Sequence, residues 1–352
     1  MDENYHRTNI KARISMSIWQ NNNIADRKAL IQRTEEQEHS HPVAVEKDWW
    51  VTVILKALFQ TSCADYLIFK GGTSLSKGWN LIERFSEDID LAISHEFFDI
   101  NSTNKNQRDK LRKKSRKYIL ETLAGELDER LRLMGVRDYE IERVDKVETA
   151  EGLKTIDSDK DPTVLLVHYK SIIDEAIDYI PPQVKVEISC LSMNEPTEMR
   201  RIESLISKYF PEEDNESACE VKTVLPTRTF LEKAFLLSEE FQKEHPRSRR
   251  MSRHLYDLEK LMDSPFGEEA LRDKVLYAAI IEHRSAYYAL KYVDYQKLYP
   301  STICFIPPVH VLDEWRNDYR LMCNSFIYGK HLEFDELLRR IAELQERFRG
   351  MK

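Results

Sequence analysis

The chain has 352 residues, of which 41% are apolar and 32% are charged, and its formal net charge is −8. This length favours two or three structural units with a sizeable core, and one long domain is also compatible with it. The acidic balance disfavours a surface that binds nucleic acid throughout, but it permits local basic patches. No apolar run reaches the roughly 18 residues of a membrane helix, and the chain begins without an apolar leader segment. We therefore expect a cytoplasmic protein with no membrane partner.

The first part of the chain predicts alternating helices and strands. Residues 45–60 carry apolar side chains at helical spacing behind acidic residues, which predicts a helix. Residues 66–69 (YLIF) form a short apolar run that ends at two glycines, as a buried strand entering a turn does. We expect a short helix over residues 73–83 and a second strand over residues 88–93 (DIDLAI).

The middle of the chain predicts one long helix and two further strands. Residues 105–134 repeat apolar side chains every three or four positions, which predicts a helix within a basic helical insertion of about residues 100–145. The polar residues 150–162 predict a loop, and a strand is expected over residues 163–170. Strict alternation of apolar and polar side chains over residues 183–191 (QVKVEISCL) predicts a third clear strand.

The last part of the chain changes to a helical pattern. We place a domain boundary near residue 225, between an α+β domain of residues 1–225 and a helical domain of residues 226–352. The clearest predicted helices of this second domain cover residues 228–243, 253–263, 268–288 and 331–348.

Two aspartates one residue apart carry the strongest chemical signal. Residues two apart share one face of a strand, so Asp88 and Asp90 are expected to point the same way. Like charges this close cost about 1 kcal/mol or more unless a cation lies between them. Mg²⁺ prefers oxygen ligands and is commonly held by one or two carboxylates plus substrate phosphates. Glu187, on the polar face of the third strand, is a candidate third carboxylate.

A glycine pair precedes these aspartates. Gly71 and Gly72 lack Cβ atoms, so a turn can bring backbone N–H groups against a phosphate at a helix start, where Thr73 and Ser74 add hydroxyls. Lys77 does not stand at the spacing of a Walker A loop, which argues against a P-loop NTPase. Taken separately, a GG pair most often marks a turn and a DxD pair a solvated face. Their order along the chain favours a platform for magnesium and a nucleotide.

Several segments resemble a known family. The order GGTS, DID and VEI is similar to the nucleotidyltransferase fold of the polymerase beta type. More closely, EKDWWVTVILKALF, FKGGTSLSKGWNLIERFSEDIDL, LEKAFLL and RHLYDL resemble the AbiEii/AbiGii toxin family of nucleotidyltransferases, including its MenT-like toxins. The resemblance implies a mixed β-sheet flanked by helices, with a helical C-terminal domain that contributes to the active site.

The resemblance also implies a nucleotide-binding set. Lys233, in LEKAFLL, is similar to the family lysine that neutralises the β and γ phosphates; the alternative for this residue is a solvated lysine paired with a neighbouring glutamate. Lys77 and Arg84 either contact phosphate or pair with Glu83 and Glu87. The residues expected to cradle the triphosphate are Gly71, Gly72, Thr73 and Ser74.

The metal-binding and catalytic carboxylates follow from the same resemblance. Asp88 and Asp90 are expected to hold Mg²⁺ or Mn²⁺. Glu187 resembles the third carboxylate, which binds metal or helps to deprotonate the attacking hydroxyl. Asp257, in RHLYDL, matches a carboxylate near the active site, and its alternative is an ion pair with Arg253 on the same helix.

Two basic stretches bear on the acceptor. Dense runs of Lys and Arg attract phosphate backbones, although such a helix face is often only solvated. With the toxin resemblance, they favour transfer of a nucleoside monophosphate from an NTP to RNA, at a tRNA 3′ end, and a cognate antitoxin partner. The alternatives are transfer to a small molecule or a protein, or a nucleic-acid-binding protein without catalysis. The candidate RNA-binding residues are Arg112, Lys113, Lys114, Arg249 and Arg250.

Overall fold

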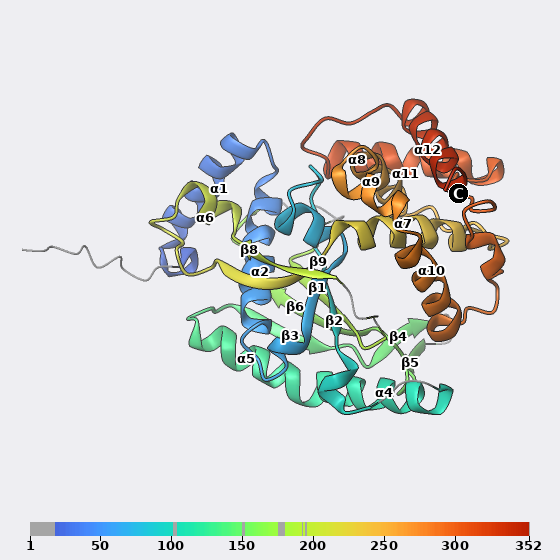
Figure 1. Ribbon diagram of the computed structural model, residues 1–352. Coiled ribbons are helices and arrows are strands. Elements are labelled where there is room, and N and C mark those ends of the chain that lie inside the picture. The colour runs from blue at the N-terminus through green and yellow to red at the C-terminus, as the bar shows by residue number, and fades with distance from the viewer. Residues whose placement is uncertain are drawn as a thin grey trace, which may run out of the picture.

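A mixed β-sheet of seven strands forms the centre of the molecule (Figure 1). The computed structural model describes residues 18–100, 104–149, 152–174, 180–191, 193 and 196–351. The strand order is β3-β6-β7-β2-β1-β9-β8, with β4 and β5 as a separate hairpin. β2 is parallel to β7 and β1 to β9, whereas the other neighbours are antiparallel. The strands are β1 (Leu67–Lys70), β2 (Ile89–Ile93), β3 (Tyr139–Arg143), β4 (Lys146–Thr149), β5 (Gly152–Thr155), β6 (Thr163–Tyr169), β7 (Gln183–Ser189), β8 (Thr197–Ile202) and β9 (Cys219–Val224).

Helices flank the sheet and make up most of the C-terminal part of the described chain (Figure 1). A π-helical turn, Ile119–Leu123, joins α4 to α5, so these two helices form one continuous helical run. The helices are α1 (Ile24–Glu38), α2 (Pro42–Leu58), α3 (Gly71–Thr73), α4 (Lys105–Tyr118), α5 (Ala124–Leu133), α6 (Leu205–Tyr209), α7 (Pro226–Glu240), α8 (Arg253–Met262), α9 (Pro265–Arg272), α10 (Lys274–His283), α11 (Leu312–Ser325) and α12 (Phe334–Arg349).

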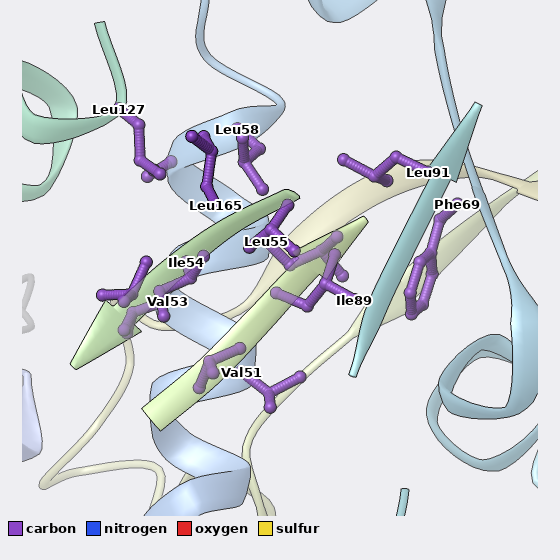
Figure 2. Close-up of a cluster of buried hydrophobic side chains, with 14 of the residues drawn as sticks. Val51, Val53, Ile54, Leu55, Leu58, Phe69, Ile89, Leu91, Leu127 and Leu165 are labelled. Atoms are coloured by element: carbon purple, nitrogen blue, oxygen red, sulfur yellow. The ribbon is translucent and has the colours of Figure 1, made fainter. Parts of the chain in front are cut away.

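One face of the sheet packs against α2 and α5. Along β6 and β7 every second side chain is buried, as the alternation of a strand requires. Figure 2 shows Val53 and Leu55 of α2 in one cluster with Ile89 and Leu91 of β2 and Leu165 of β6. Each such buried side chain contributes about 1.5–3 kcal/mol, which fixes α2 on the sheet. The intervening side chains face away from α2 and build the polar site described below.

A second cluster of buried apolar side chains joins the C-terminal helices. Phe230 and Phe235 of α7 lie in it with Phe348 of α12, and all three side chains are fully buried. Leu75 and Ile82, which follow the glycine pair, belong to the same cluster. The segment before Asp88 is therefore packed against the helical part of the chain. The expected domain boundary stays a prediction; its position falls between β9 and α7.

The expected fold class is confirmed, since a mixed sheet is flanked by helices. The helix predicted over residues 105–134 and the strands over residues 163–170 and 183–191 are confirmed within one or two residues at each end. The loop expected over residues 150–162 is wrong in part, because β5 forms a hairpin with β4 there. The strands β3, β8 and β9 carry many charged side chains and gave no clear apolar alternation.

The short helix expected over residues 73–83 is also wrong at its end. Helical structure stops at Gly78, and a β-bridge then joins Arg84 to Ile327. The helix expected over residues 268–288 is interrupted at Asp273, which caps α10 by accepting a hydrogen bond from the Leu276 N–H. None of the helices in the described ranges combines the length and the apolar character needed to cross a bilayer.

Candidate active site

Three carboxylates gather on the polar face of the sheet. Ile89 and Leu91 point into the core, so the alternation of β2 directs Asp90 to the opposite face. The parallel register of β2 and β7 places Asp90 beside Glu187. Asp88, Asp90 and Glu187 line one cavity of about 400 Å³, which we call the main cavity. The expectation that the two aspartates share a face agrees with this arrangement.

The glycine turn lies directly against Asp90. Gly71 has a φ of +80°, in the left-handed region, and a Cβ atom added there would lie 1.9 Å from Oδ2 of Asp90. Gly71 and Gly72 both line the main cavity. Only a residue without a side chain allows this backbone to approach the carboxylate so closely.

The carboxylates are poorly neutralised by their surroundings. Burial, followed by the charges of Glu187 and Asp88, raises the pKa of Asp90 to about 7. Burial also raises the pKa of Asp88, whose carboxylate lies 3.9 Å from Nη1 of Arg253. A bound cation would relieve the repulsion, and oxygen ligands suit Mg²⁺.

Glu187 has a different partner. Its carboxylate forms an ion pair with Lys185, whose Nζ lies 2.7 Å from Oε1 of Glu187. In the part of the chain that the structure describes, no three His, Cys, Asp or Glu side chains are arranged to hold a metal. The donor set therefore fits a cation held by Asp88 and Asp90 together with substrate oxygens, and Glu187 as a third ligand stays a prediction.

A buried ionic cluster forms another wall of the main cavity. Nε and Nη2 of Arg84 each lie 2.7 Å from an oxygen of Asp257, and Nζ of Lys233 lies 2.7 Å from the same carboxylate. The two cations line the cavity, whereas Asp257 is fully buried behind them. Both cations hold the pKa of Asp257 well below its usual range, and burial lowers the pKa of Lys233.

The contacts of this cluster show which protein side chains Asp257, Lys233 and Arg84 bind. Asp257 does not reach the cavity, and its partners are Arg84 and Lys233 rather than Arg253. Lys233 binds this distant carboxylate instead of a neighbouring glutamate, and the guanidinium of Arg84 does not pair with Glu83 or Glu87. Asp257 therefore positions two cations and does not itself line the main cavity.

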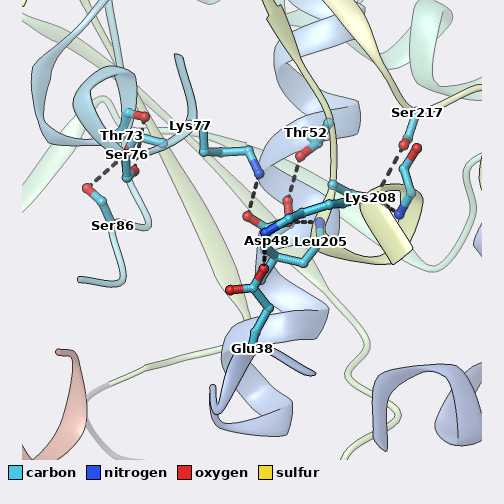
Figure 3. Close-up of polar contacts among 12 residues, drawn as sticks. Glu38, Asp48, Thr52, Thr73, Ser76, Lys77, Ser86, Leu205, Lys208 and Ser217 are labelled. Atoms are coloured by element: carbon cyan, nitrogen blue, oxygen red, sulfur yellow. Dashed lines mark hydrogen bonds and ion pairs between the residues drawn. The ribbon is translucent and has the colours of Figure 1, made fainter. Parts of the chain in front are cut away.

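The hydroxyls that follow the glycines make hydrogen bonds within the protein, and Figure 3 shows the one between Thr73 and Ser86. The Thr73 hydroxyl is 2.9 Å from Oγ of Ser86, and the Ser74 hydroxyl donates to the Gly71 carbonyl at 2.9 Å. Both residues are fully buried. Their hydroxyls therefore stabilise the turn instead of pointing into the main cavity, contrary to expectation.

Lys77 lies away from the main cavity. Its ammonium group pairs with Asp48 of α2, as Figure 3 shows. Asp48 also accepts a hydrogen bond from the Leu205 N–H at 2.7 Å. The expectations that Lys77 binds phosphate or pairs with Glu83 or Glu87 are therefore not met, because its side chain ties the turn to α2 and α6.

The sequence analysis missed Lys47 and several residues that line the main cavity. Lys47 of α2 binds the buried carboxylate of Glu87, next to Asp88, and Arg250 binds the same carboxylate. The signal for Lys47 was a run of three charges, EKD, within a helix that is otherwise mostly apolar. Further cavity-lining side chains come from the C-terminal helices and the loop before α8: Glu232, Arg247, Arg253, His254, Arg284 and Tyr288.

The candidate RNA-binding residues lie in two regions. Lys113 and Arg249 are exposed. Lys114 donates to the Phe98 carbonyl at 2.8 Å, and Arg112 donates to the Tyr287 carbonyl at 3.1 Å. Arg250 binds Glu87 and its side chain is 34% exposed, so its place in an RNA-binding surface stays a prediction.

Paired carboxylates, a glycine turn and a wall of buried cations around one cavity define a site suited to a nucleotide and a metal ion. Residues 53–340 match the family described as "Nucleotidyl transferase AbiEii toxin, Type IV TA system". The chain belongs to this family of nucleotidyltransferases, which confirms the resemblance read from its motifs.

The other comparisons add little to the family match. A search of curated proteins finds no match. Among solved structures, the chain is similar to MenT4, a nucleotidyltransferase toxin from Mycobacterium tuberculosis H37Rv, at 16% identity and a TM-score of 0.46. This similarity covers 92% of this chain and 99% of that one.

Replacing Gly71 by Ala should disable the site. The added Cβ would collide with the Asp90 carboxylate and would strain a left-handed backbone. A displacement of about 1 Å at a reacting centre costs roughly 100-fold in rate, so we expect at least about that loss in nucleotidyl transfer. Gly125→Ala is the matched control, since nothing lies within 4 Å of a Cβ at this helical position. Gly125→Ala should keep full activity and gain about 0.5–1 kcal/mol of stability; equal activity losses in both variants would contradict this role of Gly71.

Asp257→Asn should destabilise the protein strongly. It leaves Arg84 and Lys233 buried without a counter-charge, which typically costs about 3–5 kcal/mol. Urea unfolding at pH 7 measures this loss. Asp263→Asn, whose carboxylate pairs with Arg340 and Arg347 but is 57% exposed, is the control and should cost less than about 1 kcal/mol. Similar losses for both variants would show that the buried cluster is not essential.

The raised pKa of Asp90 predicts a pH-dependent stability. An unfolded aspartate titrates near pH ~4, whereas Asp90 in the folded protein titrates at about 7. The folded state binds more protons in between, so the free energy of unfolding falls as pH rises through this window. Asp90→Asn removes this loss and should therefore be more stable than the wild type at pH 8 without divalent ions, by on the order of 1–3 kcal/mol.

At pH 4.5 the two proteins should differ much less, because the carboxyl of Asp90 is then neutral in the folded state and the pH lies only slightly above the pKa of an unfolded aspartate. Urea unfolding at the two pH values gives the comparison. Mg²⁺ at pH 8 should stabilise the wild type but not Asp90→Asn. A constant difference across pH, or an equal effect of Mg²⁺ on both proteins, would rule out this account.

Proposed function

We propose that this protein is a Mg²⁺-dependent toxin, active in the cytoplasm, that transfers a nucleoside monophosphate from an NTP to RNA, at a tRNA 3′ end, with release of pyrophosphate. The observation that carries the proposal is that Asp88 and Asp90 share one cavity with Gly71 and Gly72. Membership of a type IV toxin-antitoxin family implies a nucleotide substrate and an antitoxin partner.

The residues of the main cavity divide into two roles. Asp88 and Asp90 bind the metal ion, Mg²⁺ or Mn²⁺, which when bound orients the triphosphate and offsets negative charge on the leaving group. Arg84 and Lys233 face the phosphates, and because Asp257 holds them in place, they need little reorganisation during the reaction. The backbone at Gly71 and Gly72 allows the phosphates to approach closely.

Glu187 is the better candidate for the base that receives the proton of the attacking hydroxyl. It lies in the cavity wall beside Asp90. Asp257 is fully buried, is bound to two cations and has a pKa well below the usual range. A carboxylate in that state neither reaches a substrate nor readily accepts a proton.

An RNA acceptor is supported by the basic character of α4. This helix carries eight Lys or Arg residues and one Asp. Its exposed members include Lys113, and Arg249 is exposed near α8. Such a surface binds phosphate backbones through counterion release, so we expect activity on RNA to fall with rising salt.

Label transfer tests the proposal directly. The purified protein is incubated with each α-labelled NTP, Mg²⁺ and either total RNA, total protein or small-molecule extract. Label should appear at RNA 3′ ends, and Asp88→Asn should lower the rate at least ~100-fold because the metal ion loses a ligand. Asp65→Asn, an exposed carboxylate, is the matched control. Label in protein or small molecules alone would overturn the RNA acceptor, and undiminished transfer by Asp88→Asn would overturn the site.

A further inference from the structure

A second cavity, of about 490 Å³, lies next to the main one. Four residues line both: Lys70, Asp90, Glu187 and Tyr288. Asp90 and Glu187 thus belong to a wall that the two cavities share. Transfer between two substrates requires both to meet at one reacting centre, with the attacking and leaving oxygens roughly in line. Cavities on either side of the carboxylates meet this requirement.

The two cavities differ in charge. The main cavity is lined by several cations that do not reach the second: Arg84, Lys233, Arg247, Arg253 and Arg284. The second cavity instead has Asp157, Asp159 and Asp161 beside Lys160 and Arg112. A triphosphate carries several negative charges and is repelled by acidic walls. The second cavity therefore suits a weakly charged group that donates hydrogen bonds, such as the sugar and base of a nucleoside.

Hydrogen bonds hold one wall of the second cavity in place. Asp161 accepts hydrogen bonds from Oγ of Ser189 at 2.6 Å and from the Cys190 N–H at 3.0 Å. These bonds attach the loop of residues 157–162 to the end of β7. The loop is thus held in place beside Glu187, on the same strand, rather than merely lying near it.

The basic helix α4 reaches this cavity. Arg112 of α4 lines it and donates to the Tyr287 carbonyl at 3.1 Å. The guanidinium of Arg108, one turn earlier, lies 5.1 Å from the centre of the Tyr287 ring. These contacts hold α4 against the segment that carries Tyr288 and Leu290, two further lining residues. The basic side chains of α4 therefore extend from the wall of the second cavity along the helix.

We propose that the second cavity binds the terminal nucleoside of the acceptor RNA, while α4 binds the phosphates that precede it. The assignment rests on the proposed function. The terminal hydroxyl oxygen forms a bond to the α-phosphorus, and its proton passes to Glu187. The bond between the α-phosphorus and the bridging oxygen breaks, and that oxygen leaves with pyrophosphate. The nucleotide and the acceptor thus occupy opposite sides of the Asp90 and Glu187 wall.

Steady-state kinetics of variants test which substrate uses the second cavity. Leu290→Trp fills it, and Lys160→Glu makes it more acidic. Each should raise the KM for RNA at least tenfold while leaving the KM for NTP within twofold. Leu133→Trp and Lys274→Glu are the controls, because both positions are exposed, line neither cavity and lie outside α4. Unchanged KM values for RNA, or a rise in the KM for NTP alone, would overturn the assignment.

Photocrosslinking gives a second readout that does not require turnover. An RNA with a 3′-terminal 4-thiouridine is crosslinked to the Asp88→Asn variant, and the crosslinked peptide is identified. Crosslinks should fall on residues 157–162 or 288–290, and crosslinks at residues 247–254 would overturn the proposal. If the wild type labels RNA yet the crosslinks lie elsewhere, only this inference fails. If the wild type labels no RNA, the proposed acceptor fails and this inference fails with it.

Discussion

The buried carboxylate of Asp257 is the contact on which the site depends. It binds Arg84, from the segment before β2, and Lys233, from α7, so three separate parts of the chain meet at one anion. Breaking a buried ionic group by removing one partner is costly, because the remaining charges stay without compensation. The sheet therefore supplies the carboxylates of the main cavity, and Asp257 of the C-terminal helices keeps the cations Arg84 and Lys233 beside them. Neither part forms the main cavity alone.

The segment between the glycine turn and β2 needs this support because it forms no helix of its own. Its backbone pairs instead with the chain after α11: the Phe85 N–H donates to the Phe326 carbonyl at 2.7 Å, and the Tyr328 N–H donates to the Glu83 carbonyl at 3.1 Å. Glu87 then binds Lys47 of α2 and Arg250 before α8. Asp88 follows directly, so its place in the cavity is fixed from both halves of the molecule.

The sequence predicted the parts of the site that depend on local geometry. The period of a strand placed Asp88 and Asp90 together. The glycine pair predicted a close approach of the backbone to a phosphate, and the structure shows a close approach of Gly71 to Asp90. Partners distant in the chain were not predictable, because a local pattern shows which face a side chain occupies but not what packs against it. Lys77 was therefore expected to bind phosphate or a nearby glutamate, although it binds Asp48. For Asp257 the pattern offered only Arg253 of the same helix as a partner, although its carboxylate binds Arg84 and Lys233. The edge strands of the sheet were not predicted for a related reason, since their exposed faces carry charges instead of an apolar repeat.

The charges around the main cavity are arranged asymmetrically. Three of its cations are paired with a buried anion. Arg84 and Lys233 share Asp257, and Nε of Arg284 lies 2.6 Å from Oε1 of Glu239. Asp90 has no comparable compensation, since its neighbours Asp88 and Glu187 are also acidic and its pKa is raised to about 7. Fixed cations bind a phosphate chain without needing to reorganise, whereas an uncompensated carboxylate gains most from a metal ion. The fixed cations and the carboxylate of Asp90 thus favour binding of a nucleotide together with its metal ion. This explains why a buried carboxylate is kept at position 90 although its burial is unfavourable.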